Sequence, residues 1–142
     1  MASPDFSDRP SLGIIGFGAF GRLIADHLRD FLKIYATDSA PLAEAPEGVT
    51  LTDLARVCAC DIVVLAVPVA ALGALCAQIA PLLRPGALVM DVGSVKVEPA
   101  RIMVAQLPPH VSVIATHPMF GPQSIGGRHA GAQACALSHS RR

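Results

Sequence analysis

Apolar segments of two kinds alternate along the chain. Short continuous apolar runs, typical of strands buried on both faces, lie at 12–15, 33–38, 49–51, 61–67, 87–92 and 111–115. Segments with helical spacing of apolar residues follow Gly21 and occupy 52–58, 69–83 and 96–107. This alternation predicts an α/β fold, a Rossmann-type doubly wound parallel sheet with the strand order 3-2-1-4-5-6.

A glycine motif of the pattern G-x-G-x-x-G stands between the first strand and the first helix. It consists of Gly16, Phe17, Gly18, Ala19, Phe20 and Gly21. In this context Gly16 makes a tight turn, Gly18 lets the backbone approach a pyrophosphate, and Gly21 lets the helix pack closely on the strand. The alternative is a glycine-rich turn with no ligand. We predict that all six residues belong to a dinucleotide-binding site.

Asp38 ends the second predicted strand, seventeen residues beyond Gly21. An acidic residue about 20 residues after the glycine motif binds the ribose hydroxyls of NAD. A carboxylate at this place repels the additional phosphate of NADP, and no arginine lies beside it between Thr37 and Pro41. Asp38 therefore predicts NAD as the cofactor, with NADP less favoured. The alternative is a solvated aspartate in a turn.

Two candidate catalytic residues follow the fifth and sixth predicted strands. Ser94 follows the run 87–92, and His117 follows 111–115. These strands are expected to be neighbours, about 4.8 Å apart, so that their terminal loops meet at the ligand-binding edge. An imidazole there can accept a proton or a hydrogen bond from a substrate hydroxyl, while the serine orients that hydroxyl. A structural role for His117 is an equal alternative at this point.

Composition excludes several other functions. The chain has 142 residues, which suits one domain, with 52% hydrophobic and 15% charged residues and a formal net charge of +0. No basic block precedes Arg141, so we expect no nucleic-acid partner. The apolar stretches are too short to span a membrane, so we expect no membrane partner and a cytoplasmic location. The cysteines form no C-x-x-C motif and are expected to be small buried thiols, with no metal site.

The two ends of the chain lack the strand and helix pattern. Residues 1–11 contain no apolar segment and are predicted to be a flexible N-terminal tail, not a signal peptide. Residues 124–142, rich in Gly, Ala, Ser, His and Arg, are predicted to be an irregular or disordered tail. The dinucleotide-binding domain is therefore expected over residues 12–123.

Four motifs together carry a resemblance to a known family. They are the glycine motif, Leu65–Pro68, Asp91–Lys96 and Thr116–Pro122. In order and spacing they resemble the prephenate and arogenate dehydrogenases of tyrosine biosynthesis. The resemblance implies NAD-dependent oxidative decarboxylation of prephenate or arogenate. It further implies that His117 polarises the ring hydroxyl, that Ser94 hydrogen-bonds in the same site, and that Val67 and Pro68 belong to the cofactor site.

The chain departs from the resembled family at three places. It has Gln123 where many relatives have glutamate, and Asp38-Ser39 where the plant enzymes have Ser-Arg. It also ends before the helical domain through which full-length relatives form homodimers and supply basic residues to the substrate. We therefore expect the chain alone, as a truncated form, to bind cofactor and to be weakly active or inactive. The alternatives are another β-hydroxyacid or imine dehydrogenase, or a non-catalytic nucleotide-binding module.

Overall fold

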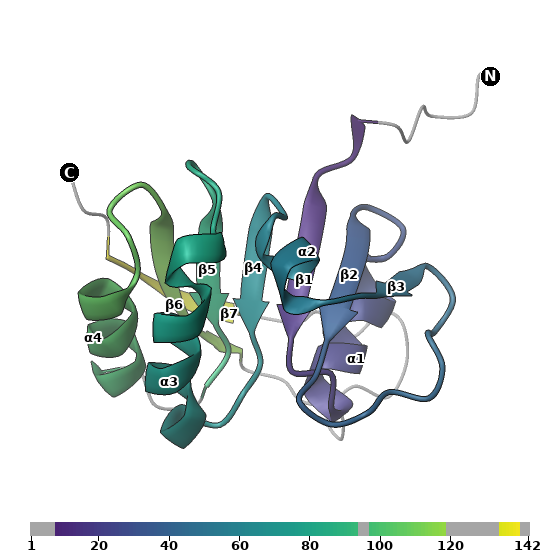
Figure 1. The fold of residues 1–142 in the computed structure, drawn as a ribbon, viewed down its shortest axis with the longest axis horizontal. Coiled ribbons are helices and arrows are strands. Elements are labelled where there is room, and N and C mark those ends of the chain that lie inside the picture. Colours follow the sequence, from purple (N-terminus) through teal and green to yellow (C-terminus); the bar gives the residue numbers. More distant parts are fainter. Residues whose placement is uncertain (1–7, 94–96, 119–133, 140–142) are drawn as a thin grey trace.

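The computed structural model describes residues 8–93, 97–118 and 134–139, with the backbone alone described at 117–118 and 134–139. Figure 1 shows a single sheet with helices on both of its faces. The elements in chain order are β1 (Ser11–Ile15), α1 (Ala19–Leu28), β2 (Lys33–Thr37), β3 (Val49–Leu51), α2 (Leu54–Cys58), β4 (Ile62–Leu65), α3 (Val69–Ile79), the 3-10 turn η2 (Ala80–Leu82), β5 (Leu88–Asp91), α4 (Val97–Gln106), β6 (Ser112–Pro118) and β7 (Ala134–His139).

The sheet has the order β3-β2-β1-β4-β5-β6-β7, and β1 to β6 are parallel. The predicted order 3-2-1-4-5-6 is therefore confirmed. Ile15, at the end of the central strand β1, lies beside Thr37 of β2 and Leu65 of β4. The carboxyl ends of β1, β2 and β4 thus meet at one edge, which is where open parallel sheets bind ligands.

The predicted irregular C-terminal tail is wrong for residues 134–139. These residues form β7, which pairs antiparallel with β6 from Val113↔His139 to Pro118↔Ala134. The outer edge of β6 has backbone N–H and C=O groups that another strand can pair with, so tertiary pairing decides the conformation here. The segment is Ala-Cys-Ala-Leu-Ser-His, in which alanine and serine replace the β-branched and aromatic residues that usually indicate a strand.

Other boundaries also differ from the prediction, and two of these differences concern strands β1 and β6. Ser11, expected in the flexible tail, belongs to β1 and pairs with Lys33, and its N–H donates to a carboxylate oxygen of Asp61 at 2.8 Å. Strand β6 continues beyond the predicted end at residue 115 to Pro118, because β7 pairs with it along this extension. His117 consequently lies within β6 and not in a loop after it.

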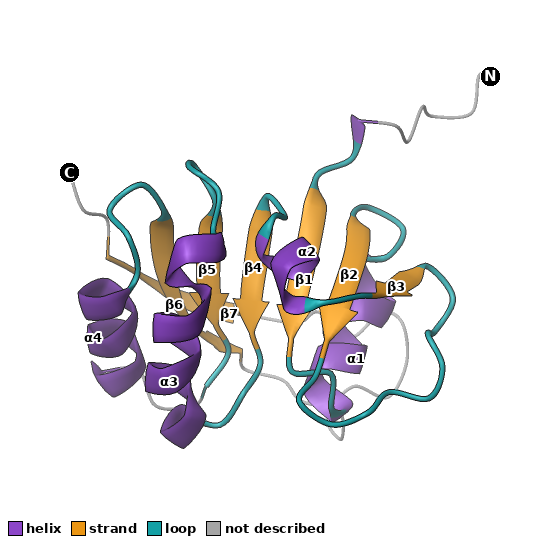
Figure 2. Cartoon of the chain, in the orientation of Figure 1, coloured by secondary structure: helices purple, strands orange, loops and turns teal. Residues whose placement is uncertain are grey.

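Two hydrophobic clusters fill the space between the sheet and its helices. Helix α1 covers one face, and α2, α3 and α4 cover the other (Figure 2). The cluster under α1 contains Phe17 and Ala25, and the cluster on the other face contains Cys76 of α3 and Met103 of α4. Hydrophobic surface buried on both faces explains why the strands are nearly continuous apolar runs.

Three of the four cysteines, Cys58, Cys60 and Cys76, are free and buried, as predicted. Burial raises the pKa of the Cys58 and Cys76 thiols to about 11, with a smaller electrostatic contribution from Cys60 to the first and from Asp91 to the second. Thiols in this state stay protonated near neutral pH and act as small apolar side chains. In the described ranges, no helix is long and apolar enough to cross a membrane.

Candidate nucleotide-binding site

The glycine motif forms the turn between β1 and α1. Gly16 has a φ of 96°, in the left-handed region that favours glycine, and its N–H donates to the Thr37 carbonyl at 2.9 Å. A Cβ atom on Gly16 would overlap the Ala66 carbonyl, and one on Gly21 would overlap the Gly16 carbonyl. The backbone therefore approaches its neighbours at both positions too closely for any side chain.

Gly18 differs from the other two glycines because a Cβ there would meet no atom within 4 Å. It is the N-cap of α1, it provides no side-chain cap, and the first turn of α1 contains no acidic residue. The first N–H groups of a helix have no partner within the helix, and they attract anions. The exposed backbone at Gly18 thus leaves space for an anionic group in front of the helix.

Asp38 lies directly after β2 and faces the glycine turn. Its Oδ2 accepts a hydrogen bond from the Phe17 N–H at 2.5 Å, and its Oδ1 accepts one from the Ala40 N–H at 2.9 Å. The Ala40 N–H is the largest cause that lowers the pKa of Asp38 below 3.8, and the Phe17 N–H lowers it further. The side chain is partly exposed, so the ionised carboxylate keeps lone pairs for a ligand hydroxyl.

A cleft of about 600 Å³ opens between the glycine turn and the loops after β2 and β4. Its lining residues come from the carboxyl ends of these strands and from α2 and α3. They are Ile15, Gly16, Gly18, Thr37, Asp38, Ser39, Leu54, Ala66, Val67, Pro68, Ala71, Ala74, Leu75 and Gln78. The volume is in the usual range for small-molecule and cofactor sites. One end of the cleft has the carboxylate of Asp38, and the wall formed by α2 and α3 is mainly apolar.

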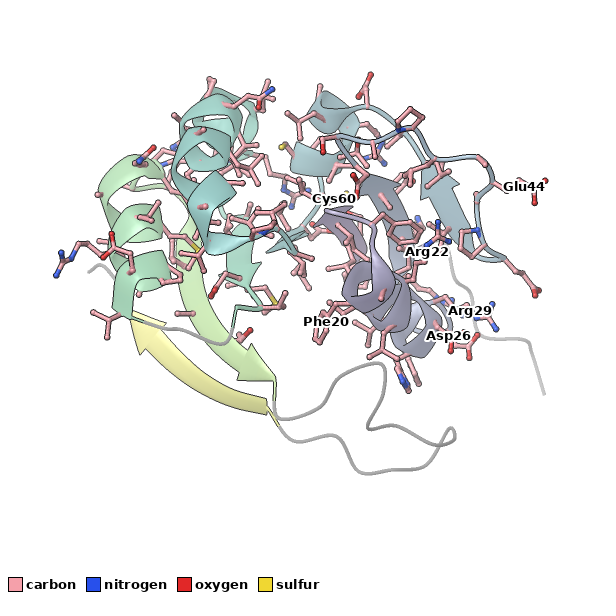
Figure 3. The ribbon with its side chains drawn as sticks, turned by 90° about the horizontal axis from the view of Figure 1, so that it is seen from below. Phe20, Arg22, Asp26, Arg29, Glu44 and Cys60 are labelled. Carbon is pink, nitrogen blue, oxygen red and sulfur yellow. The ribbon has the colours of Figure 1, made fainter. Side chains whose placement is uncertain are left out.

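The structure brings together five of the nine predicted cofactor residues in the cleft lining. These five are Gly16, Gly18, Asp38, Val67 and Pro68. The other four, Phe17, Ala19, Phe20 and Gly21, are outside the lining. Helix α1 is seen from the carboxyl edge in Figure 3, where Phe20 and Arg22 leave it on different sides.

Phe17 contributes to the site through its backbone only. Its side chain is 2% exposed and packs in the cluster beneath α1, with the Arg22 guanidinium 4.8 Å from the ring centre. Its N–H is the group that binds Asp38. Phe17 therefore lies in the glycine turn between β1 and α1, and its ring belongs to the core.

The predicted catalytic residue His117 lies at the other end of the same edge. His117 is in β6, opposite Cys135 of β7 in the register, while Ser94 falls outside the described residues. Gln123 also falls outside them. The end of β5 is described up to Gly93, and Asp91 lies beside Ala115 in β6. His117 thus lies in β6, two positions beyond Ala115, which is the partner of the last β5 residue, Asp91.

Sequence reasoning missed two parts of this edge. The first is the wall of the cleft formed by α2 and α3, which has the apolar residues Leu54 and Leu75 and the polar residue Gln78. The approach of these helices to the cleft depends on the crossover geometry. The second is Asp91, which is buried at the end of β5. A signal for Asp91 was present, because a single acid at the end of an otherwise apolar strand needs hydrogen-bonding partners.

The fold and the glycine turn define the class of the chain, a dinucleotide-binding α/β domain of the Rossmann type. Residues 33–136 match the family described as prephenate dehydrogenase, nucleotide-binding domain. The chain belongs to this family. The matched residues include Asp38, the end of β5, β6 and part of β7, while the glycine turn precedes them.

Two relatives and one solved structure illustrate the similarity. A probable arogenate/prephenate dehydrogenase from Methanocaldococcus jannaschii is 42% identical over 64 residues, which are 45% of this chain and 14% of the relative. Arogenate dehydrogenase 1, chloroplastic, from Arabidopsis thaliana is 31% identical over 125 residues, which are 83% of this chain and 20% of the relative. The chain therefore spans a fifth or less of the length of these relatives.

The structure of prephenate dehydrogenase from A. aeolicus in complex with hydroxyphenyl propionate and NAD+ has the same fold. It superposes with a TM-score of 0.69 and 24% sequence identity, covering 95% of this chain and 52% of that one.

Proposed function

We propose that this chain is the cofactor-binding part of an NAD-dependent dehydrogenase that oxidatively decarboxylates prephenate or arogenate in tyrosine biosynthesis. The observation that carries the proposal is the ionised carboxylate of Asp38, hydrogen-bonded to the glycine turn within one cleft. Membership of the nucleotide-binding-domain family supports the reaction class. The substrate, the catalytic residues and the assembly of the whole protein are part of the same proposal.

The shape and polarity of the cleft fit the adenosine half of a dinucleotide. The pyrophosphate would lie over Gly18, where a Cβ would have no neighbour and where the N-cap residue provides no side-chain hydrogen bond to the helix. The ribose hydroxyls would donate to Asp38. The adenine would lie along the apolar wall that includes Leu54 and Leu75. The pyrophosphate, the adenosine ribose and the adenine thus each have residues of matching chemistry.

A preference for NAD over NADP follows from charge. Asp38 is ionised near neutral pH because backbone N–H groups, that of Ala40 most, lower its pKa. The described residues that line the cleft include no lysine or arginine. A 2′-phosphate at this place would meet a carboxylate without a compensating cation, and like charges at a binding site disfavour the wrong ligand.

His117 and Ser94 would act on the substrate hydroxyl. A bound nicotinamide would supply the acceptor for a hydride from the ring carbon that bears the hydroxyl. His117 takes the hydroxyl proton as the C–H bond breaks, and Ser94 orients the hydroxyl. Loss of the ring carboxylate as carbon dioxide leaves its bonding electrons in the ring. The ring becomes aromatic, and the phenolate oxygen recovers a proton from His117.

Calorimetric titration tests the proposal on the chain as it is. The purified chain is titrated with NAD, then with NADP, and prephenate or arogenate is added in the presence of NAD. We expect binding of NAD at least tenfold tighter than that of NADP. The matched variants are Asp38→Asn, which should weaken NAD binding, and His117→Ala, which should leave it unchanged.

Three outcomes separate the parts of the proposal. Absence of binding to both nucleotides would overturn it. Oxidation of either ring acid that persists in His117→Ala would remove the catalytic role of that histidine and favour a different dehydrogenase. Equal affinity for NAD and NADP would overturn the cofactor preference while leaving the nucleotide site in place.

A further inference from the structure

A second carboxylate ends a strand at the same edge of the sheet. Asp91 is the last residue of β5, and it is 2% exposed. Thr116, in the neighbouring strand β6, is 8% exposed. Within the described part of the chain these are the two buried residues with polar side chains. Burial of a carboxylate is costly unless hydrogen bonds satisfy it, so its partners show what it holds in place.

The carboxylate of Asp91 joins two segments of backbone. Its Oδ1 accepts a hydrogen bond from the Thr116 N–H at 3.2 Å, and its Oδ2 accepts one from the Gly93 N–H at 3.1 Å. The Thr116 hydroxyl in turn donates to the main-chain carbonyl of Asp91. The segment leaving β5 and the extension of β6 are therefore connected through one side chain.

These bonds lie just beyond the regular pairing of β5 with β6. The register between the two strands ends at Asp91↔Ala115. The carboxylate accepts from the next N–H along β6, so it continues the pairing by one residue after β5 has ended. The chain then continues directly from Gly93 to Ser94, and from Thr116 to His117. Each of the two bonded N–H groups thus immediately precedes a predicted catalytic residue.

We propose that Asp91 is a positioning residue, whose carboxylate fixes the spacing between Gly93, at the described end of the segment leaving β5, and the extension of β6 that carries His117. The inference rests on the proposed function, because it takes His117, together with Ser94 that follows Gly93 in the sequence, to be the catalytic pair. Catalytic groups need support from residues that are themselves held rigidly, since a displacement of about 1 Å slows a reaction severely. A buried carboxylate that accepts two backbone N–H groups provides such support.

The position of Asp91 separates this role from cofactor binding. It is absent from the lining of the cleft, so its replacement should leave nucleotide affinity unchanged. It lies close to α3, where its negative charge adds to the effect of burial on the pKa of Cys76. A purely structural strand cap would instead stabilise the whole sheet without a specific effect on His117.

Amide hydrogen exchange, measured by NMR on the 142-residue chain, tests the inference. In the wild type, the amides of Gly93 and Thr116 should exchange at least 100-fold more slowly than unstructured amides. In Asp91→Asn, the side-chain NH2 group is a hydrogen-bond donor and cannot accept a bond from one of the two backbone N–H groups. The amide of Gly93 or Thr116, or both, should therefore exchange at least tenfold faster than in the wild type. The amides of β1 and β2 should keep their protection, and NAD affinity should stay within twofold.

The matched control is Thr116→Val, which removes the hydroxyl bond but leaves both bonds to the carboxylate. The Gly93 amide should keep its protection in this variant. The imidazole resonances of His117 should shift in Asp91→Asn and not in Thr116→Val, while those of His27, in α1, should stay unchanged in both. A structural role alone does not predict this difference between the two histidines.

Several results would overturn the inference. Free exchange of the Gly93 and Thr116 amides in the wild type would do so even if Asp91→Asn failed to fold. Unchanged protection in Asp91→Asn, or an equal loss of protection across the whole sheet, would do so as well. A chain that binds no nucleotide but shows the expected exchange pattern would contradict the proposed function while leaving the support by Asp91 intact.

Discussion

Two carboxylates end strands at the same edge of this sheet, and they differ in burial. Asp38, after β2, is partly exposed and lines the cleft. Asp91, at the end of β5, is buried and lies outside the lining. Both accept two backbone N–H groups, Asp38 from Phe17 and Ala40 and Asp91 from Gly93 and Thr116. The hydrogen bonding is similar, but the surroundings differ. The partly exposed carboxylate of Asp38 can also bind a ligand, whereas the buried carboxylate of Asp91 supports the backbone.

The comparison shows why the position of a residue at a strand end is insufficient to assign its role. A partly exposed carboxylate keeps free lone pairs that a ribose hydroxyl can reach. In a buried carboxylate the same lone pairs serve to satisfy the protein, and removing it leaves polar groups unsatisfied. Substitution of Asp91 should therefore mainly lower the stability of the fold, whereas substitution of Asp38 should mainly lower the affinity for a ligand.

The largest effect is expected for Asp91→Ala. The variant leaves the Gly93 and Thr116 N–H groups without their acceptor, and bonds to a charged group contribute about 1.5–3 kcal/mol each. We expect the free energy of unfolding to fall by about 3 kcal/mol or more, measured by urea denaturation. Asp38→Ala, the matched variant at the exposed end, should cost about 1 kcal/mol or less. Equal losses in the two variants would remove the distinction between the two carboxylates.

A second pair of variants tests the glycine turn itself. Gly16→Ala places a Cβ against the Ala66 carbonyl at a backbone conformation that alanine rarely adopts, so we expect a loss of about 2–3 kcal/mol in unfolding free energy. Gly18→Ala meets no atom within 4 Å and should change stability by about 0.5 kcal/mol or less. Its effect should appear in weaker NAD binding, measured by calorimetry. Unchanged NAD affinity in Gly18→Ala would contradict a pyrophosphate over this residue.

The sequence predicted the parallel order of the strands because strand and helix patterns alternate along it, and it predicted the turn at Gly16 because the glycine motif directly follows the first strand. It did not predict β7, whose conformation depends on the open edge of β6 and not on its own side chains. It placed Asp91 in a motif without a role, because the partners Gly93 and Thr116 meet it only in the folded sheet. Local patterns therefore predicted the elements, and long-range hydrogen bonds decided the rest.

The cofactor preference gives a smaller effect that sharpens the same comparison. Asp38→Asn removes the charge but keeps a side chain of the same shape, so NAD affinity should fall about tenfold, which is about 1.4 kcal/mol. NADP affinity should rise, because the carboxylate no longer repels the 2′-phosphate. Calorimetric titration with both nucleotides measures these two changes in affinity. The same substitution at Asp91 should change neither affinity, and a change there would place Asp91 in the nucleotide site.

The smallest effect concerns pH. The Ala40 N–H most strongly, together with the Phe17 N–H, lowers the pKa of Asp38 in the folded chain below its ordinary value of 3.8. Ionised Asp38 therefore favours the folded state above the ordinary pKa, and this contribution is lost as the pH falls through the lower folded value. The difference in unfolding free energy between wild type and Asp38→Asn should stay constant from pH 7 to about pH 5 and narrow below about pH 4. Urea denaturation across this range measures it. A difference that widens on acidification would mean that the N–H groups of the glycine turn do not stabilise the charged form.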